Sequence, residues 1–193
     1  MYELLNTYID TIQSKKLSVN STALIHASST SILGLLSNIV NNEQIMRFNT
    51  CGYFIFDLLY ILRNRKIKLL QGMYIYHHIV GYYYMTLDPM IYNWQQVIAW
   101  GEFSNIPSYF VYYYLKKSKE TFTDKKCVLH YQNNLKLWKK IQLIVYTIVR
   151  GGVLSFLTYK ELQIPEKRAK LYPVTGLYVM SLVWMLAIIQ KNI

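Results

Sequence analysis

Two adjacent histidines, His77 and His78, are the residues whose type and position most strongly indicate chemistry in this sequence. They lie near the middle of Ile67–Met85 (IKLLQGMYIYHHIVGYYYM), an apolar stretch that would rise about 28 Å as a helix and so cross the hydrocarbon core of a bilayer. Imidazoles are rare at that depth, and near neutral pH they can take up and release protons. The pair therefore predicts a functional site inside a membrane.

Four further ionisable side chains lie well inside other apolar blocks, where a charge that faces lipid costs at least about 2.5 kcal/mol. They are His26, Asp57, Glu102 and Arg150. We expect all of them to face inward and to meet the histidine pair in one polar layer. Arg150 is expected to form a structural ion pair with Asp57 or Glu102, which would keep that carboxylate ionised.

The expected chemistry combines the histidines with the carboxylates. Either His77 or His78 would act as a general base or accept an acyl group as an acyl-imidazole. A carboxylate, Asp57 or Glu102, would fix the tautomer of that imidazole. The expected substrate-binding residues are His26, Tyr53, Tyr74, Ser104 and Asn105. The sequence leaves open which of the two histidines faces the substrate.

Small residues beside these groups are expected to make room. Gly81 follows the two histidines by about one helical turn and would remove side-chain bulk beside both imidazoles. Gly151 and Gly152 follow Arg150 and would let a neighbouring helix approach closely. No metal site is expected, because adjacent histidines point about 100° apart around a helix.

The apolar blocks that must position these side chains predict an all-α fold. We expect a polytopic membrane bundle of about six transmembrane helices around a central polar cavity. The predicted segments are Leu17–Val40, Arg47–Leu62, Ile67–Met85, Met90–Leu115, Leu137–Tyr159 and Leu171–Gln190. Residues 1–16 are expected to be a cytoplasmic N-terminal segment, and residues 116–136 a basic cytoplasmic loop. Lys and Arg are concentrated in alternate connections, which places both termini in the cytoplasm.

Charge and cysteine usage exclude two other classes. The net charge is +11, but the basic residues lie between apolar blocks and not in a stripe with base-stacking aromatics, so we expect no nucleic-acid partner. Cys51 and Cys127 have no motif spacing. Neither a disulfide framework nor a thiolate metal site is therefore predicted.

Five short motifs carry a resemblance to a known family. They are LIHASS (Leu24–Ser29), YFIFDLLYIL (Tyr53–Leu62), the histidine pair, GEFSNIP (Gly101–Pro107) and VYTIVRGG (Val145–Gly152). As a set they resemble the TLC-domain family over roughly Leu17–Ile189, a family that includes the ceramide synthases. The resemblance implies a helical membrane domain in the endoplasmic reticulum or another endomembrane, concerned with lipids.

The motif around Glu102 distinguishes branches of that family. In ceramide synthases the histidine pair is followed, about a helix later, by a His-Asp pair and a second Asp three residues on. Here the comparable positions are Gly101, Glu102 and Asn105. The pattern formed with Ser104 and Pro107 is similar to the branch of TLC-domain-containing proteins that are not synthases.

Three functions follow as hypotheses. The first is a membrane protein that binds lipid and influences lipid homeostasis or membrane composition. The second is an acyl-CoA-dependent N-acyltransferase of the ceramide-synthase type, for which acyl-CoA would be a substrate and no cofactor would be required. The third is a proton or ion pathway, although the inverted repeat typical of transporters is missing. Expected partners are membrane lipids, including a long-chain base or a fatty acyl chain, and a second copy of the chain in a homo-oligomer.

Overall fold

The computed structural model describes residues 1–10, 15–37, 39–40, 42–64, 69–87, 93–119 and 125–192, and these residues contain helices but no strand. The prediction of an all-α fold is confirmed. The helices are α1 (Tyr2–Asp10), α2 (Lys15–Leu36), α3 (Glu43–Asn64), α4 (Leu69–Thr86), α5 (Trp94–Lys117), α6 (Lys125–Tyr146), η1 (Thr147–Val153), α7 (Leu154–Leu162) and α8 (Pro165–Asn192). The π-helix η1 joins α6 to α7 without a break, so these three elements form one long helix.

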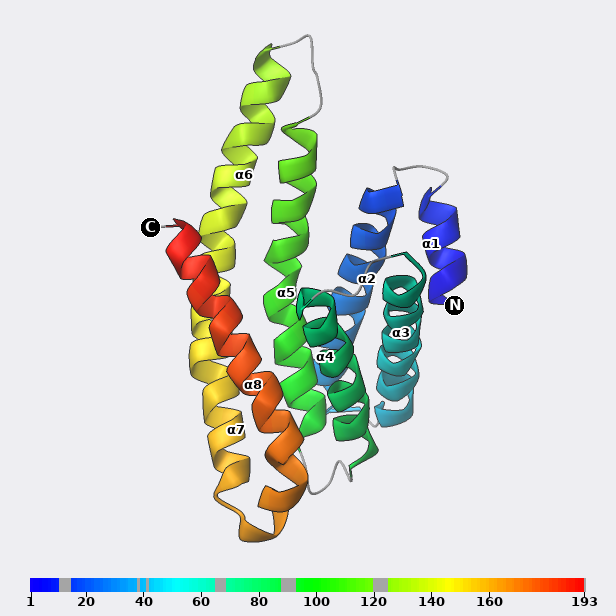
Figure 1. Cartoon of the computed structure of the whole chain (residues 1–193), viewed down its shortest axis with the longest axis vertical. Coiled ribbons are helices and arrows are strands. Elements are labelled where there is room, and N and C mark those ends of the chain that lie inside the picture. The colour runs from blue at the N-terminus through cyan, green and yellow to red at the C-terminus, as the bar shows by residue number, and fades with distance from the viewer. Residues whose placement is uncertain are drawn as a thin grey trace.

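Helix α5 occupies the middle of the bundle, and α2 and α6 pack along it on different sides (Figure 1). Helix α8 runs back along α7 and α6, while α4 contacts α3, α5 and α8. The short helix α1 packs on α2 and α3. Because α5 carries Glu102, Ser104 and Asn105, this arrangement brings the side chains of most other helices towards one central helix.

Each predicted segment is helical over most of the part that the structure describes. The starts of Ile67–Met85 and Met90–Leu115 fall partly in residues 65–68 and 88–92, which lie outside the described residues. Helix α2 ends at Leu36, a turn before the predicted end of the first segment at Val40. Helix α8 begins at Pro165, where proline suits the first helical turn because it has no N–H to leave unpaired.

The prediction of a basic loop at residues 116–136 is wrong for most of its length. Helix α5 continues to Lys117 and α6 begins at Lys125, while residues 120–124 lie outside the described residues. A high content of Lys is compatible with a helix, because Lys, Leu and Gln are all good helix formers. The charged ends of the Lys side chains are solvated on an exposed helix face. The N-terminal segment 1–16 likewise contains a helix, α1.

Three helices within the described residues are long and apolar enough to cross a membrane by length and composition. They cover Glu43–Arg63, Lys126–Leu162 and Ala169–Gln190. Helices α2, α4 and α5 are not among them. These three candidate spans indicate a membrane protein.

Helix α2 shows how polarity is distributed in the bundle. Its fully buried side chains include Ser18, Thr22 and Thr30, whereas its large apolar side chains Ile25 and Ile32 are exposed. This is the reverse of a helix in a soluble protein, whose apolar side packs inward. A polar interior with an apolar exterior is the arrangement expected when lipid, not water, surrounds the helices.

Gly34 allows the closest approach of α2 to α5. A Cβ built on it would lie 2.2 Å from the Ala99 Cβ and 2.8 Å from the backbone oxygen of Gln95.

We predict that Gly34→Ala lowers the thermal midpoint of the purified protein, since overpacking typically costs about 1–3 kcal/mol. The control is Gly72→Ala, where a Cβ would meet no atom within 4 Å. Equal midpoints for the two variants would contradict the tight α2–α5 contact.

Candidate functional site

His78 and Asp57 form a close contact between two ionisable side chains of different helices. His78 Nε2 lies 2.7 Å from Asp57 Oδ2, which joins α4 to α3. The His78 side chain is buried, and its other ring nitrogen, Nδ1, has no hydrogen-bond partner. A carboxylate that holds one nitrogen of an imidazole leaves the other available to accept a proton or to attack an electrophile. The predicted pairing of a histidine with Asp57 is present.

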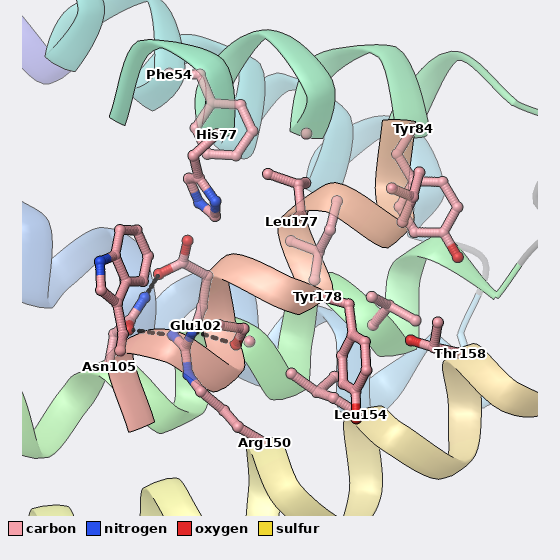
Figure 2. A pocket seen from close by; sticks show the side chains of 17 residues that line it. Phe54, His77, Tyr84, Glu102, Asn105, Arg150, Leu154, Thr158, Leu177 and Tyr178 are labelled. Atoms are coloured by element: carbon pink, nitrogen blue, oxygen red, sulfur yellow. Dashed lines mark hydrogen bonds between the residues drawn. The ribbon is translucent and has the colours of Figure 1, made fainter. Parts of the chain in front are cut away.

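His77 occupies a different environment. Its ring lies among the rings of Phe54, His78 and Trp184, with centroid distances of 6.2, 5.5 and 6.3 Å. Figure 2 shows its imidazole pointing towards the carboxylate of Glu102 across a pocket. His77 is therefore the histidine directed towards an open space, while His78 is held by a carboxylate.

The room expected at Gly81 is already occupied. A Cβ at Gly81 would lie 2.7 Å from Cε2 of Phe54, whose ring stands 4.8 Å from that of His78. The missing side chain thus admits Phe54 from α3 to pack beside the imidazoles. A Cβ built on Gly152 would lie more than 4 Å from every atom of a neighbouring helix, so the expectation of a close helix approach at Gly152 is wrong.

Glu102 is buried and has polar neighbours on two sides. Its Oε1 lies 3.7 Å from His26 Nε2, and Asn105 Nδ2 donates to its Oε2 at 3.3 Å. The predicted substrate-binding residue Asn105 thus contacts a predicted catalytic residue directly.

His26 is held inside the bundle and lines neither of the two main cavities. It is fully buried, and its ring stacks on Tyr53 with a centroid distance of 3.9 Å. Its Nδ1 lies 3.3 Å from the hydroxyl of Tyr2 and 3.2 Å from that of Thr30. Because these groups enclose the ring, His26 positions Glu102 and packs the interior, and the prediction that it contacts a substrate is not supported by its position.

Tyr2 connects the N-terminal helix to this network. Its hydroxyl also donates to Asn49 Oδ1 on α3. Burial raises the pKa of the Tyr2 phenol above its ordinary value, so the group remains a protonated donor at neutral pH. Tyr2 belongs to no motif that would indicate a role, and its contacts arise only from the docking of α1.

Arg150 does not form the predicted ion pair. No described carboxylate lies within 4.0 Å of it. Its Nε donates to Ser104 Oγ at 2.9 Å, its NH2 group to Asn105 Oδ1 at 2.7 Å, and its NH1 group to Ser181 Oγ. Its guanidinium carbon also lies 4.4 Å from the centre of the Tyr146 ring.

The physical reason is that neutral side chains already surround the guanidinium. Asn105 stands between Arg150 and Glu102, since it accepts from one and donates to the other. Arg150 belongs to the π-helix η1, whose wider turn changes the direction of side chains relative to a regular α-helix. No periodicity in the sequence indicates where such a turn falls.

Two cavities meet at these residues and extend in opposite directions. The larger has a volume of about 550 Å³ and reaches Asn20, Tyr112 and Ile188, near the end of the bundle where α2 begins and α8 ends. The smaller has a volume of about 90 Å³ and reaches Tyr84 and Thr158 near the other end (Figure 2). The residues that line both are His77, Glu102, Asn105, Arg150 and Trp184.

The cavities account for the other predicted residues. Tyr53, Asp57, Tyr74 and His78 line the larger cavity. Ser104 lines neither cavity, but it donates to the backbone of Gly101 and accepts from Arg150. Sequence reasoning missed Trp184 and Ser181 of α8, which lack a motif and reach the site only because α8 folds back along the bundle.

The described residues contain no group of three or more His, Cys, Asp or Glu side chains arranged to hold a metal ion. The polar groups that line the two cavities include imidazoles, carboxylates and one guanidinium, and they lie next to aromatic and aliphatic side chains. These groups can transfer protons and can bind polar or charged parts of an amphiphile.

No family model matches the chain, and comparison with curated proteins and with solved structures likewise gives no match. The resemblance to the TLC-domain family therefore stays a prediction that rests on the five motifs.

We predict that Arg150→Leu destabilises the protein by roughly 2–4 kcal/mol, because it leaves several buried polar partners unpaired and breaks a link between α5, η1 and α8. Lys139→Leu is the control, since Lys139 is exposed on α6. Thermal unfolding of both variants in the same detergent measures the difference. Equal midpoints would show that the hydrogen bonds of Arg150 do not hold these helices together.

Proposed function

We propose that this chain is a multi-pass membrane protein of the TLC-domain type that binds a lipid between its helices. In this proposal the six long helices cross an endomembrane such as that of the endoplasmic reticulum, and both termini face the cytoplasm. Binding would serve lipid homeostasis or membrane composition. The observation that carries the proposal is the 550 Å³ cavity, which combines ionisable and apolar walls inside a bundle with an apolar exterior.

The two kinds of wall suit the two ends of an amphiphile. Asp57, His77 and His78 offer charge and hydrogen bonds, while Trp184, Ala187 and Ile188 of α8 offer apolar surface. Ligand sites typically combine a mostly apolar lining with a few placed polar groups. A small water-soluble ligand would leave the apolar wall unused, whereas a lipid engages both.

Narrowing the larger cavity should reduce lipid binding. Ala187 lines the cavity, and its neighbour Leu186 is exposed on the outer surface of α8. We predict that Ala187→Trp lowers the amount of lipid that copurifies with the protein several-fold, because the indole fills the space that the lipid needs. Lipid extraction followed by mass spectrometry measures this amount.

Leu186→Trp is the matched control, since it adds the same ring one residue away but outside the cavity. It should retain as much lipid as the wild type. The proposal fails if the wild type carries no specifically enriched lipid, or if both variants retain the wild-type amount.

The His78–Asp57 pair favours a second candidate function, acyl transfer. In this reaction an amine of a long-chain base attacks the thioester of an acyl-CoA, the C–S bond breaks, and an amide and the CoA thiol are formed. The Nδ1 atom of His78 is buried in this structure, and a local movement has to bring it to the larger cavity. There it can take the proton of the amine or attack the thioester itself, while Asp57 stabilises the resulting imidazolium. His77 and Glu102 face the same space and can bind the substrate.

If acyl transfer takes place, Asp57→Asn should lower its rate by at least about 100-fold, because the imidazole loses the anion that orients it and stabilises its cation. The assay uses membranes that contain the full chain, labelled acyl-CoA and long-chain bases. His78→Ala should abolish the amide product, whereas Lys139→Leu should leave it unchanged. A wild type that forms no product from any amine tested excludes this function.

A further inference from the structure

Arg150 is a buried cation whose hydrogen-bonding partners are all neutral. The residue is 5% exposed, and its donors reach the hydroxyls of Ser104 and Ser181 and the amide oxygen of Asn105. Moving an ion from water into a protein interior costs free energy unless an opposite charge or hydrogen bonds compensate it, and the same holds for the interior of a membrane. The site is therefore electrostatically incomplete in the described residues.

Glu102 does not complete it. Its two carboxylate oxygens are directed to His26 and to the amide nitrogen of Asn105. The same Asn105 amide separates Glu102 from Arg150, so the guanidinium has no direct contact with a carboxylate.

Arg150 also has unused donors at a cavity wall. A guanidinium has five N–H groups in a planar fork, and the three bonds to protein account for three of them. The residue lines both cavities, and Figure 2 shows it beside the smaller one. A purely structural clamp between α5, η1 and α8 would need neither a full charge nor a position on the cavity wall.

We propose that Arg150 binds the anionic headgroup of an amphiphile, a carboxylate or a phosphate monoester, whose alkyl chain occupies the larger cavity. Arginine is suited to these groups because its parallel N–H groups match two oxygens of one anion. Beyond the headgroup, Trp184, Ala187 and Ile188 provide an apolar lining for the chain. His77, on the opposite wall, can donate to the same headgroup. This inference rests on the proposed lipid-binding function and specifies the class of lipid.

The test compares three ligands with the same chain, namely hexadecanoate, hexadecyl phosphate and hexadecan-1-ol. They are added at equal concentration to the full-length protein in a non-ionic detergent, and native mass spectrometry measures the bound fraction of each. We expect at least one of the anions to bind about tenfold or more tightly than the alcohol, as charge-assisted hydrogen bonds would require. The arm that shows the preference tells whether the headgroup is a carboxylate or a phosphate.

Arg150→Gln should abolish this preference while binding of the alcohol changes little. Arg63→Gln is the matched control, because Arg63 is exposed at the end of α3 and pairs only with Glu3. If Arg150→Gln does not fold, the comparison in the wild type still decides. If the anions and the alcohol bind equally well, the inference about the headgroup is wrong, but lipid binding is not contradicted. The same conclusion holds if Arg150→Gln keeps the preference for the anion. If none of the three ligands binds, both proposals fail.

Discussion

The cost of placing a charge in hydrocarbon is the constraint on which the rest of this structure depends. Asp57 and Arg150 lie in helices long and apolar enough to cross a membrane, so each of these polar groups has to find its partners inside the bundle. Helix α5 makes this possible because it lies between α2 and α6 and contacts α4 as well. On α5, Glu102 contacts His26 of α2, and Asn105 accepts a hydrogen bond from Arg150 of η1.

Partners in the interior are chosen by geometry more than by charge. Asp57 meets a histidine at 2.7 Å, but Arg150 is bound by two serines and an asparagine although Glu102 is close by. The neutral amide of Asn105 donates to the carboxylate, accepts from the guanidinium and keeps the two charges apart. Such a network leaves part of each charge uncompensated, and ligand binding can use that remainder.

The two histidines of the pair have separate roles in this arrangement. His78 is fixed by Asp57, and its Nδ1 is buried without a hydrogen-bond partner. His77 stands where the two cavities meet and faces Glu102. Adjacent residues on a helix point in different directions, so one imidazole can be held by α3 while the other reaches the ligand space. This division makes both lipid recognition and acyl transfer chemically reasonable at one place.

The amino-acid sequence by itself determined that the chain is helical, where most of its long helices lie, and that ionisable groups on different helices face the interior, but it did not show that α6 begins as early as Lys125. These features follow from local hydrophobicity and from the cost of exposing charge to lipid. Only the tertiary structure decided that Asp57 pairs with His78, that Asn105 separates Glu102 from Arg150, and that Tyr2 and Trp184 join the site. Those contacts depend on the rotation and register of each helix against its neighbours and on a π-helical turn. Side-chain packing between segments that are distant in the sequence sets these features.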